Sequence, residues 1–140
     1  MNFIKNFAIT MAAVSLLTAV PALAQSGEIV ATGTFHGAAH KTSGRATIYS
    51  LNGNETLRLT NFKTSNGPDV HVVLIAASDA QDNENFLNKN VERVELGKLK
   101  GNEGDQDYAV PAGTDLSKFK AVSIYCERFN ANFGTAPLEK

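Results

Sequence analysis

Cys126 is the only cysteine among the 140 residues, and its thiol is the side chain best suited to redox chemistry. A cysteine reacts as its thiolate, which needs a lowered pKa and some access to solvent. Arg128 follows two positions later, so on a continuous strand its guanidinium would share a face with the thiol and favour the thiolate. We therefore take Cys126 as the candidate redox thiol, with Tyr125 and Arg128 shaping its surroundings.

The same pattern supports a second hypothesis for Cys126. Val122 and Ile124 precede the cysteine at intervals of two residues. Because side chains alternate between the two faces of a strand, the thiol would point to the same face as these aliphatic side chains. A free cysteine on an apolar strand face is usually buried and packs like a small hydrophobic side chain. A single cysteine also excludes an intramolecular disulfide. The residues alone leave both hypotheses open, a reactive thiol and an inert core residue.

Three histidines are further candidates for binding a metal or a cofactor, and all of them precede Cys126: His36, His40 and His71. A blue-copper site needs a cysteine, a histidine and usually a methionine clustered near the C-terminus, but the two methionines are Met1 and Met11. Covalent c-type haem needs Cys-x-x-Cys-His, which one cysteine cannot supply. Non-covalent haem held by His40 and His71 remains an alternative, but the sequence requires no cofactor and predicts no metal site.

His71 occurs in the apolar run Val70–Ile75, and a buried imidazole needs a hydrogen-bond partner. Asp69 has the same parity and is the candidate partner, in a pair that is either structural or part of a cofactor site. His36 and His40 flank Gly37, where a hairpin is expected, and we expect their rings to bond backbone groups there.

The acidic loop at residues 101–107 offers the ligand types that suit calcium. Its carboxylates are those of Glu103, Asp105 and Asp107. The order of these residues does not follow an EF-hand, and acidic loops between strands are usually ordinary solvated turns. We also find no Gly-x-Ser-x-Gly element, so no hydrolase triad is indicated and enzyme activity stays undecided.

The first 24 residues have the form of a cleaved signal peptide. Lys5 gives a basic start, an apolar run follows over residues 7–20, and Ala22-Leu23-Ala24 has the small-x-small form of a cleavage site. The apolar run is shorter than the ~20 residues of a membrane-spanning helix, and no later run reaches that length. We expect a secreted or periplasmic protein without a membrane span, its mature part being residues 25–140.

The charge balance excludes one class of partner. Lys and Arg number 13 and Asp and Glu number 14, so the net charge is −1, without the basic excess that nucleic acid requires. Hydrophobic residues make up 43% of the chain and charged residues 19%, which is typical of a chain with a packed core.

The elements that must position these side chains are strands. Short runs rich in β-branched and aromatic residues alternate with turn residues such as Asn52-Gly53. The stretch from Ser78 to Asn90 lacks strand character and is expected to be a loop or a single helical turn. About seven or eight short strands predict an all-β fold, an antiparallel β-sandwich or partly open barrel, forming a single domain. The runs that we expect to form strands are Ile29–Phe35, Arg45–Leu51, Thr56–Phe62, Val70–Ala76, Val91–Leu96, Asp107–Val110 and Ala121–Phe129.

The order and spacing of several short motifs resemble the DM13 domain family over nearly the whole mature chain. These motifs are Gly33-Thr34-Phe35, His40 to Gly44, Leu57-Arg58-Leu59 with Asn61-Phe62, Asn66 to Val72, Leu96 to Asn102 with Gly104 to Gln106, Ile124-Tyr125-Cys126, Phe129 and Phe133-Gly134. The resemblance implies an extracytoplasmic β-rich module, often found in animals beside DOMON domains. It also implies electron transfer or another redox reaction centred on a characteristic cysteine, the position of Cys126. Members of the family commonly have Trp before this cysteine, where this chain has Tyr125.

Two functions follow as hypotheses. In the first, the Cys126 thiolate is oxidised or forms a mixed disulfide with a redox partner protein, because a lone cysteine cannot resolve its own oxidation. In the second, the chain is a non-catalytic module that binds another extracytoplasmic protein, and Cys126 only packs in the core.

Overall fold

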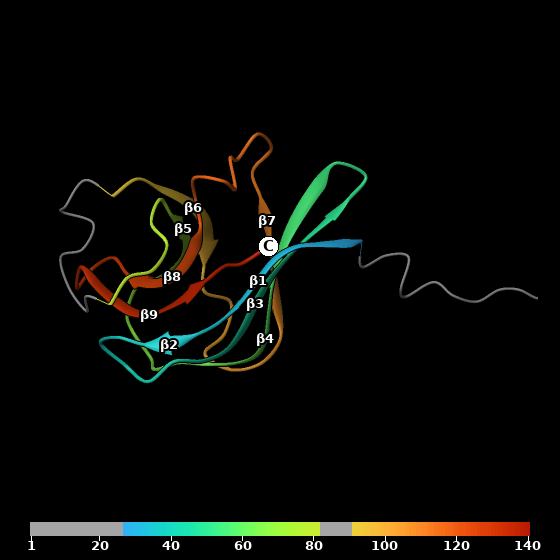
Figure 1. Cartoon of the computed structure of the whole chain (residues 1–140). Helices are drawn as coiled ribbons and strands as arrows, with labels where there is room; N and C mark the ends of the chain where they lie inside the picture. The colour runs from blue at the N-terminus through green and yellow to red at the C-terminus, as the bar shows by residue number, and fades with distance from the viewer. Residues whose placement is uncertain (1–26, 82–90) are drawn as a thin grey trace, which may run out of the picture.

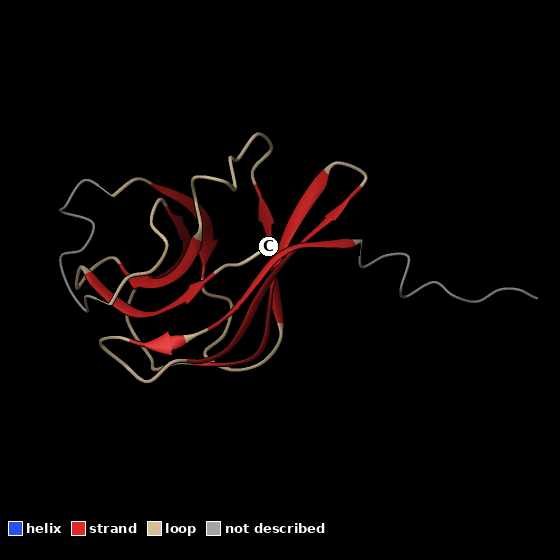
Figure 2. Ribbon diagram, in the orientation of Figure 1, coloured by secondary structure: helices blue, strands red, loops and turns tan. Residues whose placement is uncertain are grey.

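The computed structural model describes residues 27–81 and 91–140, which contain nine strands and no helix (Figure 2). The expected signal peptide and most of the expected loop at Ser78–Asn90 lie outside these residues. No helix among the described residues is long and apolar enough to cross a bilayer. The strands are β1 (Glu28–Thr34), β2 (His36–Gly37), β3 (Ser43–Leu51), β4 (Asn54–Lys63), β5 (Val70–Ile75), β6 (Arg93–Lys98), β7 (Gln106–Val110), β8 (Ala121–Cys126) and β9 (Ala131–Pro137).

The strands form two sheets that face each other (Figure 1). One sheet has four strands in the order β1-β3-β4-β7, and the other has five in the order β2-β9-β8-β5-β6. Every pairing within them is antiparallel. The predicted all-β antiparallel sandwich is confirmed, and no closed barrel forms.

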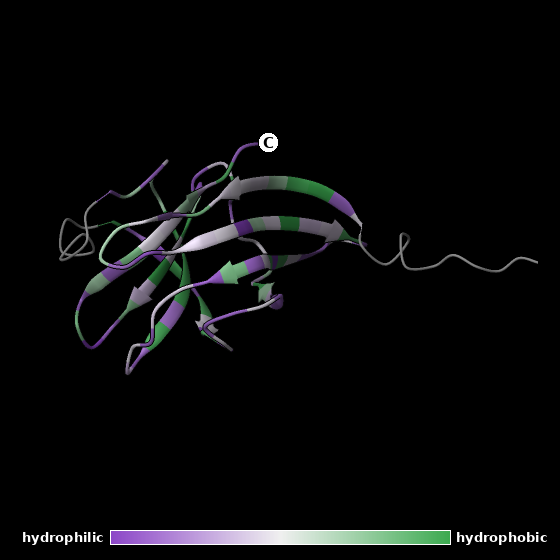
Figure 3. Cartoon of the chain, turned by 90° about the horizontal axis from the view of Figure 1, so that it is seen from below, coloured by the Kyte–Doolittle hydropathy of each residue, from purple (hydrophilic) through white to green (hydrophobic). Residues whose placement is uncertain are grey.

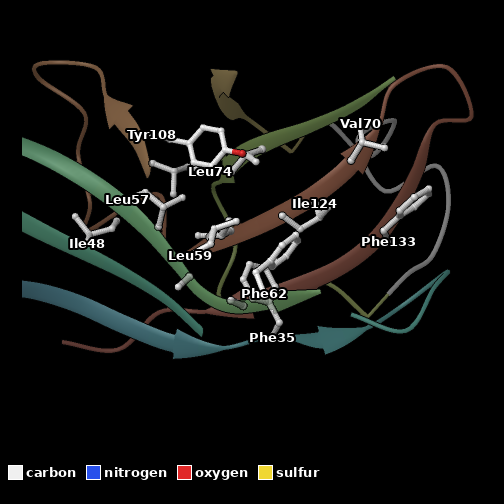
Figure 4. Packing of buried hydrophobic residues seen from close by; sticks show 14 of the residues in the cluster. Phe35, Ile48, Leu57, Leu59, Phe62, Val70, Leu74, Tyr108, Ile124 and Phe133 are labelled. Carbon is white, nitrogen blue, oxygen red and sulfur yellow. The ribbon is translucent and has the colours of Figure 1, made fainter. Parts of the chain in front are cut away.

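Side-chain alternation builds the core between the sheets. Apolar and polar residues alternate in bands along the strands (Figure 3), so that each strand presents one face to the facing sheet. The fully buried side chains that meet there include Ile48, Leu57, Leu74 and Ile124 (Figure 4). Their burial stabilises the fold by roughly 1.5 to 3 kcal/mol for each large apolar side chain.

The outer face of the five-stranded sheet carries a second, smaller apolar cluster. It contains Val73 and Ile75 of β5 with Ala121 and Tyr125 of β8. Both faces of β5 are therefore covered, and β5 lies between β8 and β6, as the doubly apolar run Val70–Ile75 predicts.

Two strand predictions need correction. The expected strand Ala121–Phe129 ends at Cys126, because residues 127–130 form a turn in which Asn130 has a φ of 50°. The chain then reverses into β9, a strand that the sequence did not predict because Asn132, Gly134 and Pro137 all have low strand propensity. In β9 they are tolerated because the strand pairs with both β8 and β2.

Gly134 allows a close approach of β9 to its neighbours. A Cβ built there would lie 2.4 Å from Cβ of Thr42 and 2.7 Å from the carbonyl oxygen of His36. Thr42 is itself fixed, since its hydroxyl donates to the Phe133 carbonyl at 3.1 Å. No flexible side chain can move away to make room for a methyl group.

We predict that Gly134→Ala lowers the free energy of unfolding by about 1 to 3 kcal/mol, because the added methyl overpacks fixed atoms. Gly101→Ala is the control, since a Cβ there would meet only the Glu103 carbonyl oxygen, at 3.5 Å. The free energy of unfolding of the control should lie within about 0.5 kcal/mol of that of the natural protein, or be slightly higher. Urea unfolding measures both, and equal losses in the two variants would contradict the argument.

Candidate functional site

Cys126 is the last residue of β8, and its side chain is 0% exposed. It lies in the core cluster with Val122 and Ile124, which confirms that the three share one face. It is a free thiol, and an exposed turn follows it at once. The thiol is thus buried at the rim of the core, one residue from solvent-exposed chain.

Arg128 does not accompany the thiol. The expectation that it shares a strand face with Cys126 is wrong, because β8 ends before it and Arg128 lies exposed in the turn. The alternation rule applies only while the strand continues. The predicted cationic partner of the thiolate is therefore not provided by strand geometry.

Tyr125 points to the opposite face of the sheet and is 4% exposed. Its hydroxyl donates to the side-chain oxygen of Asn130, which ties the end of β8 to the far side of the turn. The Arg93 guanidinium lies 5.4 Å from the ring centroid, within the range of a cation–π contact. Burial raises the pKa of Tyr125, and the charge of Arg93 opposes this rise. Tyr125 stands directly opposite His71 in the register of β8 and β5.

His71 is the centre of a cluster of acidic side chains on this outer face. Its Nε2 lies 2.9 Å from Oδ1 of Asp69 and 3.5 Å from Oε2 of Glu127, and its Nδ1 lies 2.7 Å from Oε2 of Glu95. Burial alone would lower the pKa of His71, but the hydrogen bonds to Glu95 and Asp69 raise it above its usual value. The predicted pair of His71 with Asp69 is confirmed.

The sheet explains why these four residues meet. Asp69 ends the turn before β5, His71 is the second residue of β5, and Glu95 comes from the paired strand β6. Glu127 follows β8, the other neighbour of β5, and its N–H donates to the Asp69 carbonyl at 2.9 Å. Nothing in the sequence indicates Glu95, because strand pairing brings it to the cluster. One feature of the sequence does indicate Glu127: it is adjacent to Cys126, so alternation points its side chain to the face opposite the thiol.

The other two histidines occupy separate positions. The Nε2 of His36 forms a hydrogen bond with Oδ1 of Asp79, at 2.6 Å. Its Nδ1 lies 3.0 Å from the Gly37 carbonyl oxygen. The ring of His40 packs edge-on against Phe133, with 4.2 Å between centroids. The expected ring-to-backbone bond is thus present for His36. His40 packs against Phe133 whereas His71 bonds Asp69 and Glu95, so the described residues do not bring the two histidines together as a pair of haem ligands.

The carboxylates of the acidic loop considered for calcium have basic side chains and a backbone N–H of the protein as partners. Arg58 binds both carboxylate oxygens of Asp107, at 3.0 and 3.1 Å, and its other terminal nitrogen lies 3.5 Å from Asp105. The Asn61 N–H donates to Asp105, and Lys63 lies 4.0 Å from Glu103. These carboxylates have protein partners, as in a structural loop.

The His36–Asp79 pair gives a pH prediction. Burial would lower the pKa of His36, but the bonds to Asp79 and the Gly37 carbonyl raise it above 6.5. Because the folded-state pKa is the higher one, the pair stabilises the fold fully below pH 6.5, and this contribution is lost as the pH rises through the folded-state pKa.

We expect Asp79→Asn to lower the pKa of His36 in an NMR titration of its ring protons. The substitution should also destabilise the protein more at about pH 5.5 than at about pH 8.5. Glu28→Gln is the control, since Glu28 is exposed and its loss removes the same charge elsewhere. A pKa of His36 unchanged by Asp79→Asn would contradict the pair.

Comparisons with known proteins bear on the chain as a whole. A search of curated proteins and a search of solved structures each found no match. A scan against family models matched residues 34–138 to the family described as electron transfer DM13. The match covers every strand except most of β1, and it includes the cluster around His71 and the buried thiol. It agrees with the resemblance carried by the motifs. Since the matched segment is well over half of the chain, this protein belongs to the DM13 electron-transfer family.

Proposed function

We propose that this chain is an extracytoplasmic electron-transfer module whose redox group is the Cys126 thiol. The observation that carries the proposal is the position of the one free thiol, at the final residue of β8 and immediately before an exposed turn. Membership of an electron-transfer family supports a redox role. The signal peptide expected at residues 1–24 supports secretion or a periplasmic location.

A partner can reach the thiol only if the end of β8 opens. The bonds that hold it closed include those from the Tyr125 hydroxyl to Asn130 and from the Glu127 N–H to the Asp69 carbonyl. Local openings of this kind cost less free energy than global unfolding, because few contacts break. The proposed module therefore reacts from an opened state and protects its thiol at rest.

The chemistry in the opened state is thiol–disulfide exchange with a partner protein. Cys126 loses its proton to water, and the thiolate attacks one sulfur of a disulfide on the partner. A mixed disulfide forms, and the second sulfur of the partner leaves as a thiolate. Because this chain has no second cysteine, net electron transfer needs a second protein with two thiols. One of these thiolates attacks the sulfur of Cys126 and releases the first partner in its reduced form, and the other then closes the disulfide of the second protein and releases the Cys126 thiolate.

One observation favours a second candidate function, a module that binds another extracytoplasmic protein without redox chemistry. Cys126 is 0% exposed and belongs to the main core cluster. A thiol so placed packs like an aliphatic side chain and resists oxidation. The two candidates differ in whether Cys126 reacts while the rest of the protein stays folded.

We expect native Cys126 to react with a thiol reagent at about pH 8 faster than the protein unfolds globally. Tyr125→Phe removes the hydroxyl, with its bonds to Asn130 and Arg93, but keeps the ring, so it should speed the labelling about two- to tenfold. Tyr108→Phe is the matched control, because it removes a buried hydroxyl that bonds Gln106 and the Lys100 N–H, far along the chain from the turn. Mass spectrometry follows the labelling.

Two results would reject the redox proposal. One is labelling of the native protein no faster than its global unfolding rate, measured in urea. The other is equal acceleration by Tyr125→Phe and Tyr108→Phe, which would report a general loss of stability. Either result would leave the binding module as the function.

A further inference from the structure

We infer that Asp69, His71 and Glu127 form a binding site for a divalent transition-metal ion of the Zn²⁺ type, on the outer face of the five-stranded sheet. This differs from the sequence-based expectation of no metal site. One ligand atom of each residue lies within 4.8 Å of the other two. The inference does not depend on the reactivity of Cys126.

The distances match those between ligands of one small ion. Bonds of about 2.0 to 2.2 Å from a metal to nitrogen and oxygen place neighbouring ligand atoms about 3 to 3.5 Å apart. The Nε2 of His71 lies 2.9 Å from Oδ1 of Asp69 and 3.5 Å from Oε2 of Glu127. The Glu127 side chain is 47% exposed, so it is free to adjust its position around an ion.

The Nε2 of His71 is the ring nitrogen that a metal ion can take, by displacing the proton that Nε2 shares with Asp69. The Nδ1 of His71 lies 2.7 Å from the Glu95 carboxylate, which accepts only, so Nδ1 carries a proton. The Nε2 then points at two carboxylates, and a bare lone pair there would repel both. A positive species must stand between them, either a proton or a metal ion. A carboxylate behind a histidine ligand is also the usual support of metal sites, since it fixes the ring and raises its basicity.

The charges around the ring favour a divalent ion over a single proton. Three carboxylates, those of Asp69, Glu95 and Glu127, surround one imidazole. Among the described residues, Lys98 is a cation close to this cluster, with its Nζ 3.9 Å from Asp69 and its side chain 78% exposed. A proton on His71 leaves most of this negative charge uncompensated, whereas a divalent ion offsets two units of it.

The backbone holds the ligands ready. Val70 pairs with Cys126, and the Glu127 N–H donates to the Asp69 carbonyl at 2.9 Å, so both turns that carry the carboxylates are fixed to each other. His71 itself is 13% exposed and lies on a strand with partners on both sides. Little backbone freedom must be lost when an ion binds, which favours affinity.

The donor set selects the class of ion. One imidazole and two carboxylates suit Zn²⁺, Cu²⁺ and their neighbours, with water in the open positions. Calcium takes six to eight oxygen ligands and gains little from an imidazole. We therefore expect Zn²⁺ to bind more tightly than Mn²⁺ or Ca²⁺, in the order of intrinsic affinities for such a site.

Calorimetric titration of the chelator-treated protein with Zn²⁺ at about pH 7.5 tests the site. We expect one equivalent to bind, and binding to weaken by about ten- to hundredfold in Glu95→Gln, the variant of the supporting carboxylate. Glu127→Gln and His71→Ala, which remove ligands, should weaken it at least as much. Glu103→Gln is the matched control, because Glu103 is an exposed carboxylate whose partner is Lys63.

A second readout separates a lost site from a lost fold. Zn²⁺ should raise the urea midpoint of the natural protein and of Cys126→Ala, but not that of Glu127→Gln. Binding retained by Glu127→Gln, loss of binding in Cys126→Ala, or equally tight binding of Ca²⁺ would each overturn the inference. Failure of this test would leave the thiol proposal untouched, since Cys126 labelling is measured without metal.

Discussion

The packing of the two sheets against each other decides which way every side chain on a strand points. Val72, Leu74 and Ile124 are completely buried between the sheets, so the register of β5 and β8 cannot slip by one residue without exposing them. This constraint places Cys126 inside and Tyr125 outside. The buried thiol and the acidic cluster on the outer face therefore have one cause, the apolar alternation of two adjacent strands.

Much of this arrangement is local and was accessible from the sequence. Alternation within Val70–Ile75 predicts a strand covered on both faces, and parity predicts that Asp69 meets His71. The same rule predicts the inward thiol, because Val122 and Ile124 precede it at intervals of two. The alternation of apolar and polar residues does not predict where a strand ends. Asn130 reverses the chain with a positive φ, and the placement of Arg128 failed for that reason.

Pairing between strands is the other part that a single sequence does not contain. Glu95 reaches His71 because β6 lies beside β5, and Glu127 reaches it because β8 lies on the other side. The two residues are 32 positions apart, and neither stands near His71 in the chain. Strand β9 shows the same limit, since Asn132, Gly134 and Pro137 have low strand propensity and pairing with two neighbouring strands makes it a strand.

Tyr125, Cys126 and Glu127 are consecutive, yet they face three different surroundings: the outer cluster, the core and solvent beside His71. A contact that fixes Glu127 also restrains the end of β8 that covers the thiol, because a single peptide bond joins Cys126 and Glu127. Thermodynamic linkage makes this coupling reciprocal. A ligand on the outer face that tightens this turn would reduce reaction at the thiol, and a partner attached to the thiol would weaken that ligand by the same factor. The end of β8 thus connects the two faces of one sheet, with Cys126 on the inner face and Glu127 beside His71 on the outer face.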